Sequence, residues 1–247
     1  MNKKVFITGA SSGIGEYLAY AYAKQKYFLG LAARRKDHLE TVASKCEEMG
    51  GNAKAYPLDV LDGNACKTAI QDFIALPGKV DTIYANAGVG NPDALSSGSA
   101  ETMNHILSIN ILGVTNTVMP FIPLLKEQKA GKIAVVSSVA SFRGLGHHSA
   151  YSGSKAALRN MCQGWGSALY KHGISVTAIC PGFIKSEMTD KNQYSMPFLL
   201  ETHVAADKIK RAVERRKKVF IFPWQMRFFM VPLMKHTPDC IMRKFGM

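Results

Sequence analysis

The first fifteen residues join a short apolar run to a glycine-rich turn, and this pairing restricts the fold more than any other feature of the sequence. Residues 4–7 (Lys-Val-Phe-Ile) predict a buried strand, and residues 8–15 (Thr-Gly-Ala-Ser-Ser-Gly-Ile-Gly) predict a turn that leads into a helix. Gly9 permits a tight turn, Gly13 lets backbone N–H groups approach a pyrophosphate, and Gly15 permits close packing of the helix on the strand. A glycine turn can be ordinary punctuation, but between a strand and a helix it is typical of a dinucleotide site.

The alternation of apolar strand and helix continues along the chain. Further strands are predicted at 28–33, 53–58, 80–85, 132–136, 174–180 and 219–222, and helices at 37–49, 62–74, 101–126, 149–170 and 205–216. This order predicts an α/β fold, a doubly wound and mostly parallel sheet with helices on both faces, Rossmann-like. The 247 residues are 47% apolar, enough for one core, so we expect a single domain over 1–247. Within it, 186–247 are expected to form a mobile substrate loop (186–200) and an atypical basic and hydrophobic C-terminal extension.

Tyr151 and Lys155 stand four residues apart in a predicted helix, so they share one helix face. A free phenol titrates near pH ~10 and a free lysine near ~10.4. Because a nearby cation favours the phenolate, we expect Lys155 to lower the pKa of Tyr151 toward working pH. Tyr151 is therefore a candidate proton donor to, or acceptor from, an alcohol oxygen. By itself the pair fits an ordinary, partly exposed helix face better, and the motifs that precede it in the chain favour the catalytic interpretation.

Over roughly residues 4–190 the chain resembles the short-chain dehydrogenase/reductase family. Thr8-Gly-x-x-x-Gly-x-Gly15 resembles the family's glycine motif, and residues 86–88 match its Asn-Ala-Gly motif, which supports the sheet and lines the cofactor cleft. Pro181-Gly182 resembles the Pro-Gly motif at the nicotinamide end. Ser186 stands where the family often has threonine, which is a departure.

The resemblance implies four catalytic residues, which are Ser138, Tyr151, Lys155 and Asn110. Ser138 follows a predicted strand and precedes Tyr151 by thirteen residues, and Ser137 is the less favoured choice. In the implied mechanism hydride passes from NADPH to a carbonyl carbon, Tyr151 protonates the oxygen and Ser138 positions it. Lys155 lowers the tyrosine pKa and holds the cofactor ribose, while Asn110 holds a water that links Lys155 to solvent. A buried, hydrogen-bonded asparagine is an equally compatible interpretation of Asn110.

The residues after the second strand bear on which nicotinamide nucleotide binds. Ala33 occupies the place of the acid that bonds the ribose of NAD, and Arg34 and Arg35 follow it. Arginine forks bind phosphate well, so NADP(H) is favoured, although two solvated arginines heading a helix give the same pattern. The resemblance places Asp59 at the adenine, whereas a helix cap is the better interpretation of Asp62. The full set of cofactor-binding candidates is Gly9, Ser11, Ser12, Gly13, Ile14, Gly15, Arg34, Arg35, Asp59, Val60, Asn86, Ala87, Gly88, Tyr151, Lys155, Pro181, Gly182 and Ile184.

Charge and cysteine content narrow the remaining classes. The net charge is +13, and residues 208–247 carry eleven Lys or Arg and two acids. No zinc-finger, RNP-type or basic-zipper pattern accompanies this basic end, so we expect no nucleic-acid partner. The five cysteines are scattered and odd in number, which predicts neither a disulfide framework nor a metal site and fits a reducing compartment. No signal peptide is expected, and no stretch is expected to reach the ~18 apolar residues of a membrane-spanning helix.

The tail after residue 222 is the most individual part of the sequence. If residues 224–235 form a helix, apolar side chains occupy nearly all its sides, which predicts burial. The helix would then pack on its own domain or on a sister subunit and roof a pocket for a hydrophobic carbonyl. The alternative is shallow attachment to an anionic membrane through the tail's lysines and arginines. Residues 237–239 (Thr-Pro-Asp) predict the start of one more short helix.

The favoured function is an NADP(H)-dependent oxidoreductase that acts on a hydrophobic aldehyde, ketone or steroid-like substrate. Two alternatives stay open, a 3-oxoacyl-carrier reductase and a non-catalytic NADP-binding sensor or interaction protein. We expect a cytoplasmic homo-oligomer, a dimer or tetramer, with peripheral contact at the inner face of a membrane as an alternative for the tail. The apolar residues expected to pair helices 101–126 and 149–170 between subunits are Ile109, Leu112, Leu158 and Trp165.

Overall fold

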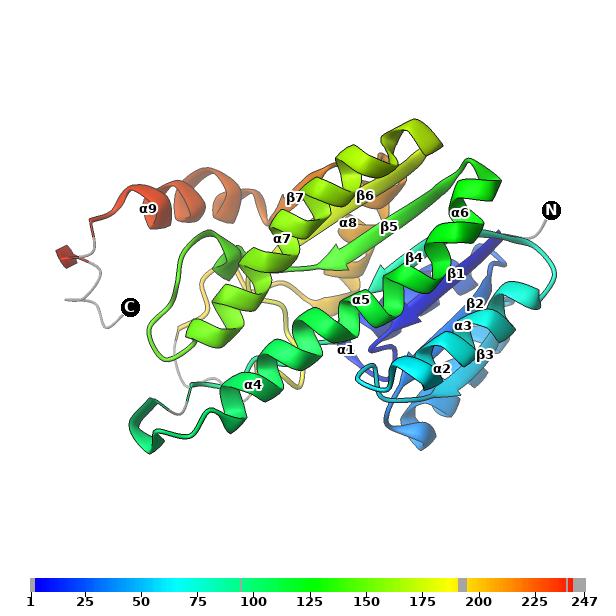
Figure 1. Cartoon of the computed structure of the whole chain (residues 1–247), viewed down its shortest axis with the longest axis horizontal. Helices are drawn as coiled ribbons and strands as arrows, with labels where there is room; N and C mark the ends of the chain where they lie inside the picture. Colours follow the sequence, from blue (N-terminus) through cyan, green and yellow to red (C-terminus); the bar gives the residue numbers. More distant parts are fainter. Residues whose placement is uncertain (1–2, 94, 191–194, 239, 242–247) are drawn as a thin grey trace.

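Seven parallel strands form one sheet in the order β3-β2-β1-β4-β5-β6-β7, in a computed structural model that describes residues 3–93, 95–190, 195–238 and 240–241 (Figure 1). The strands are β1 (Lys3–Thr8), β2 (Phe28–Ala33), β3 (Asn52–Pro57), β4 (Lys79–Ala85), β5 (Gly131–Val136), β6 (Ile174–Pro181) and β7 (Val219–Phe222). The order reverses between β1 and β4, where a doubly wound sheet opens its ligand crevice. The predicted Rossmann-like α/β fold of one domain is confirmed.

Helices cover both faces of the sheet because the strand side chains alternate between them. Val5 and Ile7 of β1 belong to one buried cluster, and Phe6 belongs to the other. The first cluster packs under α1 (Gly13–Ala23), α2 (Lys36–Glu48) and α8 (Thr202–Glu214). The second packs under α3 (Gly63–Ala75), the helices between β4 and β5, and α7 (Ser149–Leu169). Figure 1 shows β5 pointing toward the end of the molecule where α4 and α9 lie.

The helical run between β4 and β5 is irregular. Its segments are α4 (Glu101–Leu107), a π turn η2 (Ser108–Leu112), α5 (Gly113–Val118), a 3-10 turn η3 (Met119–Phe121) and α6 (Ile122–Gln128). The expectation that no stretch is apolar enough to span a membrane was wrong for this run, which contains such an 18-residue window. The run lies against the sheet, and several of its apolar side chains are packed in the core. A core helix is apolar for this reason and reaches the same hydropathy.

Two of the four residues expected at a subunit interface are instead interior residues. Ile109 and Leu158 are buried within the domain and contact neighbouring core side chains. The apolar character of these residues did not distinguish the side of the helix that meets the sheet from the side that meets solvent. Leu112 stays exposed, and Trp165 is half-buried.

The tail forms a helical segment from Trp224 to His236, built from a π turn η6 (Met226–Met230) and α9 (Val231–His236). Its own domain buries this helix on one side only, and the packing of its other sides on a sister subunit stays a prediction. Met226, Val231 and Met234 are buried, whereas other apolar residues of the helix are exposed. The short helix predicted to begin at 237–239 falls largely outside the described residues. Shorter 3-10 turns are η1 (Leu95–Ser97), η4 (Val139–Phe142) and η5 (Tyr170–His172).

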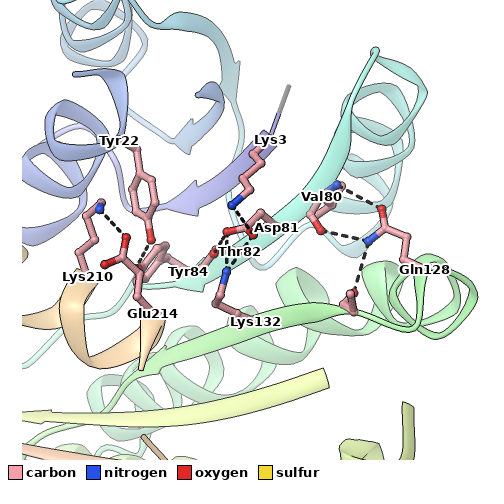
Figure 2. A network of polar contacts seen from close by, with 11 residues as sticks. Lys3, Tyr22, Val80, Asp81, Thr82, Tyr84, Gln128, Lys132, Lys210 and Glu214 are labelled. Atoms are coloured by element: carbon pink, nitrogen blue, oxygen red, sulfur yellow. Dashed lines mark hydrogen bonds and ion pairs between the residues drawn. The ribbon is translucent and has the colours of Figure 1, made fainter. Parts of the chain in front are cut away.

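A buried polar network ties helices α1 and α8 to the sheet (Figure 2). The hydroxyls of Tyr22 on α1 and Tyr84 on β4 share a 2.9 Å hydrogen bond, and the Lys210 ammonium lies 5.0 Å from the Tyr22 ring centroid. Lys210 also pairs with Glu214. Burial raises the pKa of both tyrosines, so they remain neutral phenols. The network is therefore structural and needs no ionised tyrosine.

Candidate functional site

The glycine turn between β1 and α1 has a backbone that only glycine accepts without strain. Gly9 and Gly13 adopt left-handed φ angles of +66° and +61°. A Cβ atom on Gly15 would lie 2.3 Å from the carbonyl oxygen of Gly9. A Cβ on Gly9 would in turn lie 2.9 Å from the Cα of Ala87. The turn is thus packed on itself and on the segment after β4, and Ser11, Ser12 and half-buried Ile14 stand in it.

The Asn-Ala-Gly segment after β4 holds this turn in place. The Asn86 side-chain amide donates to the carbonyl oxygens of Thr8 (3.0 Å) and Gly9 (3.1 Å). The Thr8 hydroxyl accepts the backbone N–H groups of Asn86 (3.2 Å) and Ala87 (3.3 Å). These bonds join the ends of β1 and β4, which are neighbours in the sheet at the point where its order reverses. The predicted support of the central sheet by this motif agrees with the geometry.

The two arginines after β2 lie in different surroundings. Arg35 donates to the hydroxyl of Ser12 (2.7 Å), to that of Ser11 (3.3 Å), and to the carboxylate of Glu187 (2.9 Å). Arg34 is exposed and stands 3.9 Å from the Asp59 carboxylate. Both guanidinium groups thus stand beside predicted cofactor residues. Of the two, Arg35 is the one in contact with the glycine turn.

Asp59 and Asp62 have different contacts, and the helix cap predicted for Asp62 is present. Asp62 caps α3, since its carboxylate accepts the N–H of Ala65 at 2.9 Å. Asp59 accepts the N–H of Leu61 at 2.9 Å and also faces Arg34. Val60, buried between them, packs against Gly113, where a Cβ would lie 2.6 Å from a Val60 methyl group.

Lys155 is buried at the start of α7 and has a strongly perturbed environment. Its ammonium donates to the carbonyl oxygen of Val136 at 3.0 Å and lies 5.7 Å from the ring centroid of Tyr151. Burial lowers the pKa of Lys155 to about 8. A buried lysine with a depressed pKa beside a tyrosine is a recognised mark of a catalytic centre.

Asn110 lies opposite Lys155 in the π turn η2. Its side-chain oxygen accepts the N–H of Val89 at 2.9 Å, and its amide nitrogen donates to Val89 O (3.0 Å) and to the Ser154 hydroxyl (2.9 Å). A Cβ on Gly88 would lie 2.9 Å from the Asn110 oxygen and 3.1 Å from the Lys155 ammonium. Gly88 is therefore the spacer that lets these two side chains approach. The interpretation of Asn110 as a buried, hydrogen-bonded asparagine describes its present contacts.

Ser138 and Ser137 differ in what their hydroxyls do. Ser137 is buried and donates to the carbonyl oxygen of Lys155 at 2.7 Å, which joins β5 to α7. Ser138 follows β5, and its hydroxyl accepts the N–H of Ala140 at 3.1 Å at the start of η4. The Ser137 hydroxyl already donates its proton to a backbone oxygen. Among the residues that the structure describes, no hydrogen bond donated by the Ser138 hydroxyl is found. This difference favours Ser138 as the residue that meets a substrate oxygen.

The Tyr151 ring and the Met188 sulfur both lie against Gly90, and the sequence analysis singled out neither Gly90 nor Met188. A Cβ on Gly90 would lie 3.2 Å from the Tyr151 ring and 3.3 Å from the sulfur of Met188. Met188 is 45% exposed and belongs to the turn that begins the predicted substrate loop. No motif identifies such a residue, and only its place in the 186–200 stretch could have suggested it.

Asp93 is a second residue that the sequence did not single out. Its carboxylate accepts the N–H groups of Ser149 and Ala150 (3.1 Å for Ala150) at the first turn of α7. Burial alone would raise the pKa of Asp93, but these donors outweigh it and hold the pKa below its usual value. Asp93 thus anchors the start of the helix that carries Tyr151 and Lys155. His147 and His148 precede that helix, and His148 is its N-terminal flanking residue.

The Pro-Gly segment after β6 meets the C-terminal tail. The N–H of Gly182 donates to Phe222 O at 2.8 Å, and a Cβ on Gly182 would lie 2.8 Å from the Met226 side chain. Pro181 ends β6, and buried Ile184 pairs with Leu200 in an isolated bridge. Ser186 lies beside the glycine turn, 3.7 Å from the position of a Cβ on Gly13. The strand end, the substrate loop and the tail therefore converge on one side of the site.

The tail is also attached to the segment that follows Ser138. The Arg143 guanidinium donates to the carbonyl oxygens of Met234 and Thr237. The Lys235 ammonium lies 5.0 Å from the ring centroid of Phe142, at the end of η4. Arg143 was missed because its partners are ninety residues away in the sequence. The described residues contain no group of His, Cys, Asp and Glu that would hold a metal ion.

Known proteins resemble this chain over most of its length. Residues 3–196 match the family model described as short chain dehydrogenase. A relative from Arabidopsis thaliana, named 11-beta-hydroxysteroid dehydrogenase-like 2, is 38% identical over 93% of this chain and 76% of its own. A solved short-chain dehydrogenase from Sphingobium yanoikuyae in complex with NADPH has a TM-score of 0.81 at 24% identity, over 98% of this chain and 94% of that one. One from Burkholderia phymatum in complex with NAD has a TM-score of 0.86 at 22% identity, over 98% and 95%.

Proposed function

We propose, from the premise that this chain belongs to the short-chain dehydrogenase family, that it transfers hydride between NADP(H) and a carbonyl or alcohol group. The observation that carries the proposal is the meeting of Lys155 and Asn110 beside Gly88, with Tyr151 next to Lys155. Ser138 stands just after the strand β5 that Lys155 contacts. These residues lie at the carboxyl ends of the parallel strands, where open α/β sheets bind ligands.

The glycine turn fits a nicotinamide nucleotide. Gly9 and Gly13 have left-handed φ angles, and Gly15 has no room for a Cβ, so the turn passes tightly into α1. The first backbone N–H groups of a helix have no partner within the helix, and a pyrophosphate is favoured there. When bound, the nicotinamide supplies or accepts the hydride. Asp59 and Val60 would contact the adenine end, and Pro181, Gly182 and Ile184 the nicotinamide end.

The chain's own residues would handle the proton. The Tyr151 phenol gives a proton to the carbonyl oxygen during reduction and takes it back during oxidation, and the Ser138 hydroxyl orients that oxygen. Lys155, held 5.7 Å from the tyrosine ring, favours the phenolate by its charge and would also hold the cofactor ribose. Asn110 would hold a water that carries protons from solvent to Lys155. The close approach of Asn110 and Lys155 across Gly88 supports this relay.

The preference for NADP(H) rests on Arg34 and Arg35. Ala33 replaces the acid that would repel a 2′-phosphate, and Arg35 already bonds the glycine turn. Its second partner, Glu187, is an exposed carboxylate that a bound phosphate would replace. A phosphate meets two guanidinium groups here, and arginine binds phosphate with charge-assisted, bidentate hydrogen bonds.

The substrate class in this proposal is a hydrophobic aldehyde, ketone or steroid-like molecule. Met188 and Tyr151 both lie against Gly90, and Met226 lies on Gly182, so flexible apolar side chains border the reacting end of the site. The relative from Arabidopsis thaliana carries a hydroxysteroid dehydrogenase-like name, which agrees with this class. We further propose a cytoplasmic homo-oligomer, in which Leu112 and Trp165 remain available for an interface.

Consumption of NADPH and of NADH by the purified chain against aldehydes, ketones, steroids and 3-oxoacyl thioesters tests the proposal. Turnover of apolar ketones with NADPH well ahead of NADH is the expected result. Tight NADPH binding without any turnover would replace the proposal with a sensor, and turnover of 3-oxoacyl thioesters alone would replace it with a carrier-bound acyl reductase.

A further inference from the structure

One face of the tail helix is apolar and open to solvent. We call the residues Trp224, Phe228, Phe229 and Leu233 the aromatic face. Each of these side chains is 60% or 61% exposed. Single exposed apolar residues are ordinary, but a contiguous patch of large ones marks an interaction site. The ring centroids of Trp224 and Phe229 are 5.9 Å apart, so these two members of the face adjoin each other.

The π turn η6 creates this face. In a regular α-helix, residues five apart point about 140° away from each other, because the repeat is 3.6 residues. The wider π turn brings Trp224 and Phe229 onto one side. The same turn brings Met226 and Val231 together on the other side, where both are buried. The helix thus has one apolar face against its own domain and a second one against solvent.

A basic groove runs beside the aromatic face. It has a volume of about 610 Å³, and Trp224 and Phe228 form part of its wall. Its basic lining residues are Lys208, Arg211, Arg215, Lys217 and Arg227. None of the described residues that line it is acidic. Of the acids on α8, Glu214 is paired with Lys210, and neither it nor Asp207 belongs to the lining.

We propose that the aromatic face and the basic groove together bind an anionic lipid bilayer. The bilayer surface offers phosphates and carboxylates for the groove and, directly beneath them, an apolar layer for the rings. Tryptophan and phenylalanine beside lysine and arginine are the composition of segments that lie in this interface. An acidic protein would satisfy the groove but would have to bring its own apolar patch to cover four exposed side chains.

The proposal does not depend on the reaction proposed above. The helix that meets lipid in this account also packs on Gly182 and is held by Arg143 beside η4. Its buried face therefore borders the site while its exposed face lies in the membrane surface. Vesicle binding is measured without any turnover, so failure of the reaction and failure of the lipid contact are separate results.

Flotation of the purified full chain with vesicles tests the inference. Phosphatidylcholine vesicles with and without phosphatidylserine are compared at about 0.1 M and about 1 M salt, where the Debye length falls from about 10 Å to about 3 Å. We expect binding to the anionic vesicles at low salt, with most of it lost at high salt. A second readout uses Trp165→Phe, which leaves Trp224 as the only tryptophan, since the chain has two. Its fluorescence should shift to the blue with anionic vesicles only.

Matched variants separate the two parts of the surface. Lys208→Glu/Arg211→Glu/Arg215→Glu should lower binding to anionic vesicles by well over tenfold, and Lys45→Glu/Lys67→Glu/Lys171→Glu, with the same net charge, should not. Phe228→Ser/Phe229→Ser should also lose binding, whereas Tyr170→Ser, which changes an 81% exposed ring elsewhere, should not. Circular dichroism and NADPH binding check that each variant is folded.

Three results would overturn the inference. The first is no flotation by the folded full chain at low salt, and the second is equal binding loss in the two triple-charge variants. The third is a solution mass that falls to that of the monomer in Phe228→Ser/Phe229→Ser, while the unsubstituted chain does not bind vesicles. That outcome would assign the aromatic face to a second copy of the chain.

Discussion

The Lys155 ammonium bonds the carbonyl oxygen of Val136, the last residue of β5, and so ties the start of α7 to the carboxyl edge of the sheet. The bond holds the ammonium charge near the Tyr151 ring. The contacts described for Lys155 include no carboxylate that would neutralise this charge. Burial therefore dominates, and the pKa of Lys155 falls to about 8. Burial of this charge therefore lowers the free energy of unfolding, and this cost can be measured.

The first prediction follows from that cost. The folded state binds the Lys155 proton more weakly than the unfolded state, whose lysine titrates near 10.5. Below pH 8 the wild type carries the full penalty, and its free energy of unfolding should rise between pH 8 and 10.5 relative to Lys155→Met. Urea unfolding of the cofactor-free protein at several pH values measures this difference. Lys171→Met is the exposed control, and a difference for Lys155→Met that does not change with pH would contradict the assigned burial.

The second prediction concerns the proton donor. Tyr151→Phe keeps the ring but removes the hydroxyl, so the fold and NADPH affinity should persist while turnover falls by about 10²–10⁴. Steady-state kinetics and cofactor titration measure the two quantities. The companion Ser137→Ala should instead lower thermal stability, because it breaks the bond to the Lys155 carbonyl. Retention of more than a few per cent of activity in Tyr151→Phe would remove the tyrosine from its role.

The third prediction concerns the 2′-phosphate. Arg34→Ala and Arg35→Ala should each weaken NADPH binding by several-fold and leave NADH binding nearly unchanged, since only NADPH carries the phosphate. Glu187→Gln should tighten NADPH binding, because the carboxylate that competes for Arg35 is gone. Titration calorimetry with both nucleotides measures all three. Equal losses for the two nucleotides would assign the arginines to another task.

The fourth prediction concerns the glycine turn. Gly15→Ala should destabilise the protein and abolish cofactor binding, because its Cβ would lie 2.3 Å from a backbone oxygen that cannot move aside. Gly164→Ala is the matched control on α7, where a Cβ meets nothing within 4 Å. That substitution should stabilise the fold by about 0.5–1 kcal/mol. Thermal melting of the two variants should therefore show shifts of opposite sign.

Local patterns were enough to predict the sheet, and the resemblance to a known family supplied the candidate catalytic residues. Thr8, Asn86 and Ser138 each stand at the end of a strand, and the carboxyl ends of parallel strands meet at one edge of the sheet. Helical spacing places Tyr151 and Lys155 on one face, and the resemblance to the family makes them catalytic candidates. Each of these inferences needs only the residues within about one element of the site.

Contacts between distant segments could not be predicted in the same way. Two contacts depend on how the tail folds back, that of Gly182 with Met226 and that of Arg143 with Met234. The sequence around Gly182 or Arg143 contains no pattern that indicates the partner. Ile109 and Leu158 fail for a related reason, since an apolar residue on a helix fits a subunit interface and a core equally well. Which side of the tail helix faces the domain could not be predicted either, because apolar residues occupy nearly all its sides and the π turn changes which of them share a side.

That turn makes the tail sensitive to a kind of change that residue-by-residue substitution does not sample. The π turn places residues five apart on one side, as it does Met226 and Val231, whereas a regular α-helix does so for residues four apart. Loss of a single residue after Met226 in this turn would therefore restore the regular repeat and leave Val231 and Met234 facing the domain. Gain of a single residue there would instead rotate everything after it by about 100° about the helix axis and turn both side chains out of the domain. Gene variants with one codon inserted here should thus alter the molecule more than variants with one codon deleted, because the phase of the helix, and not its composition, decides which side chains meet the protein.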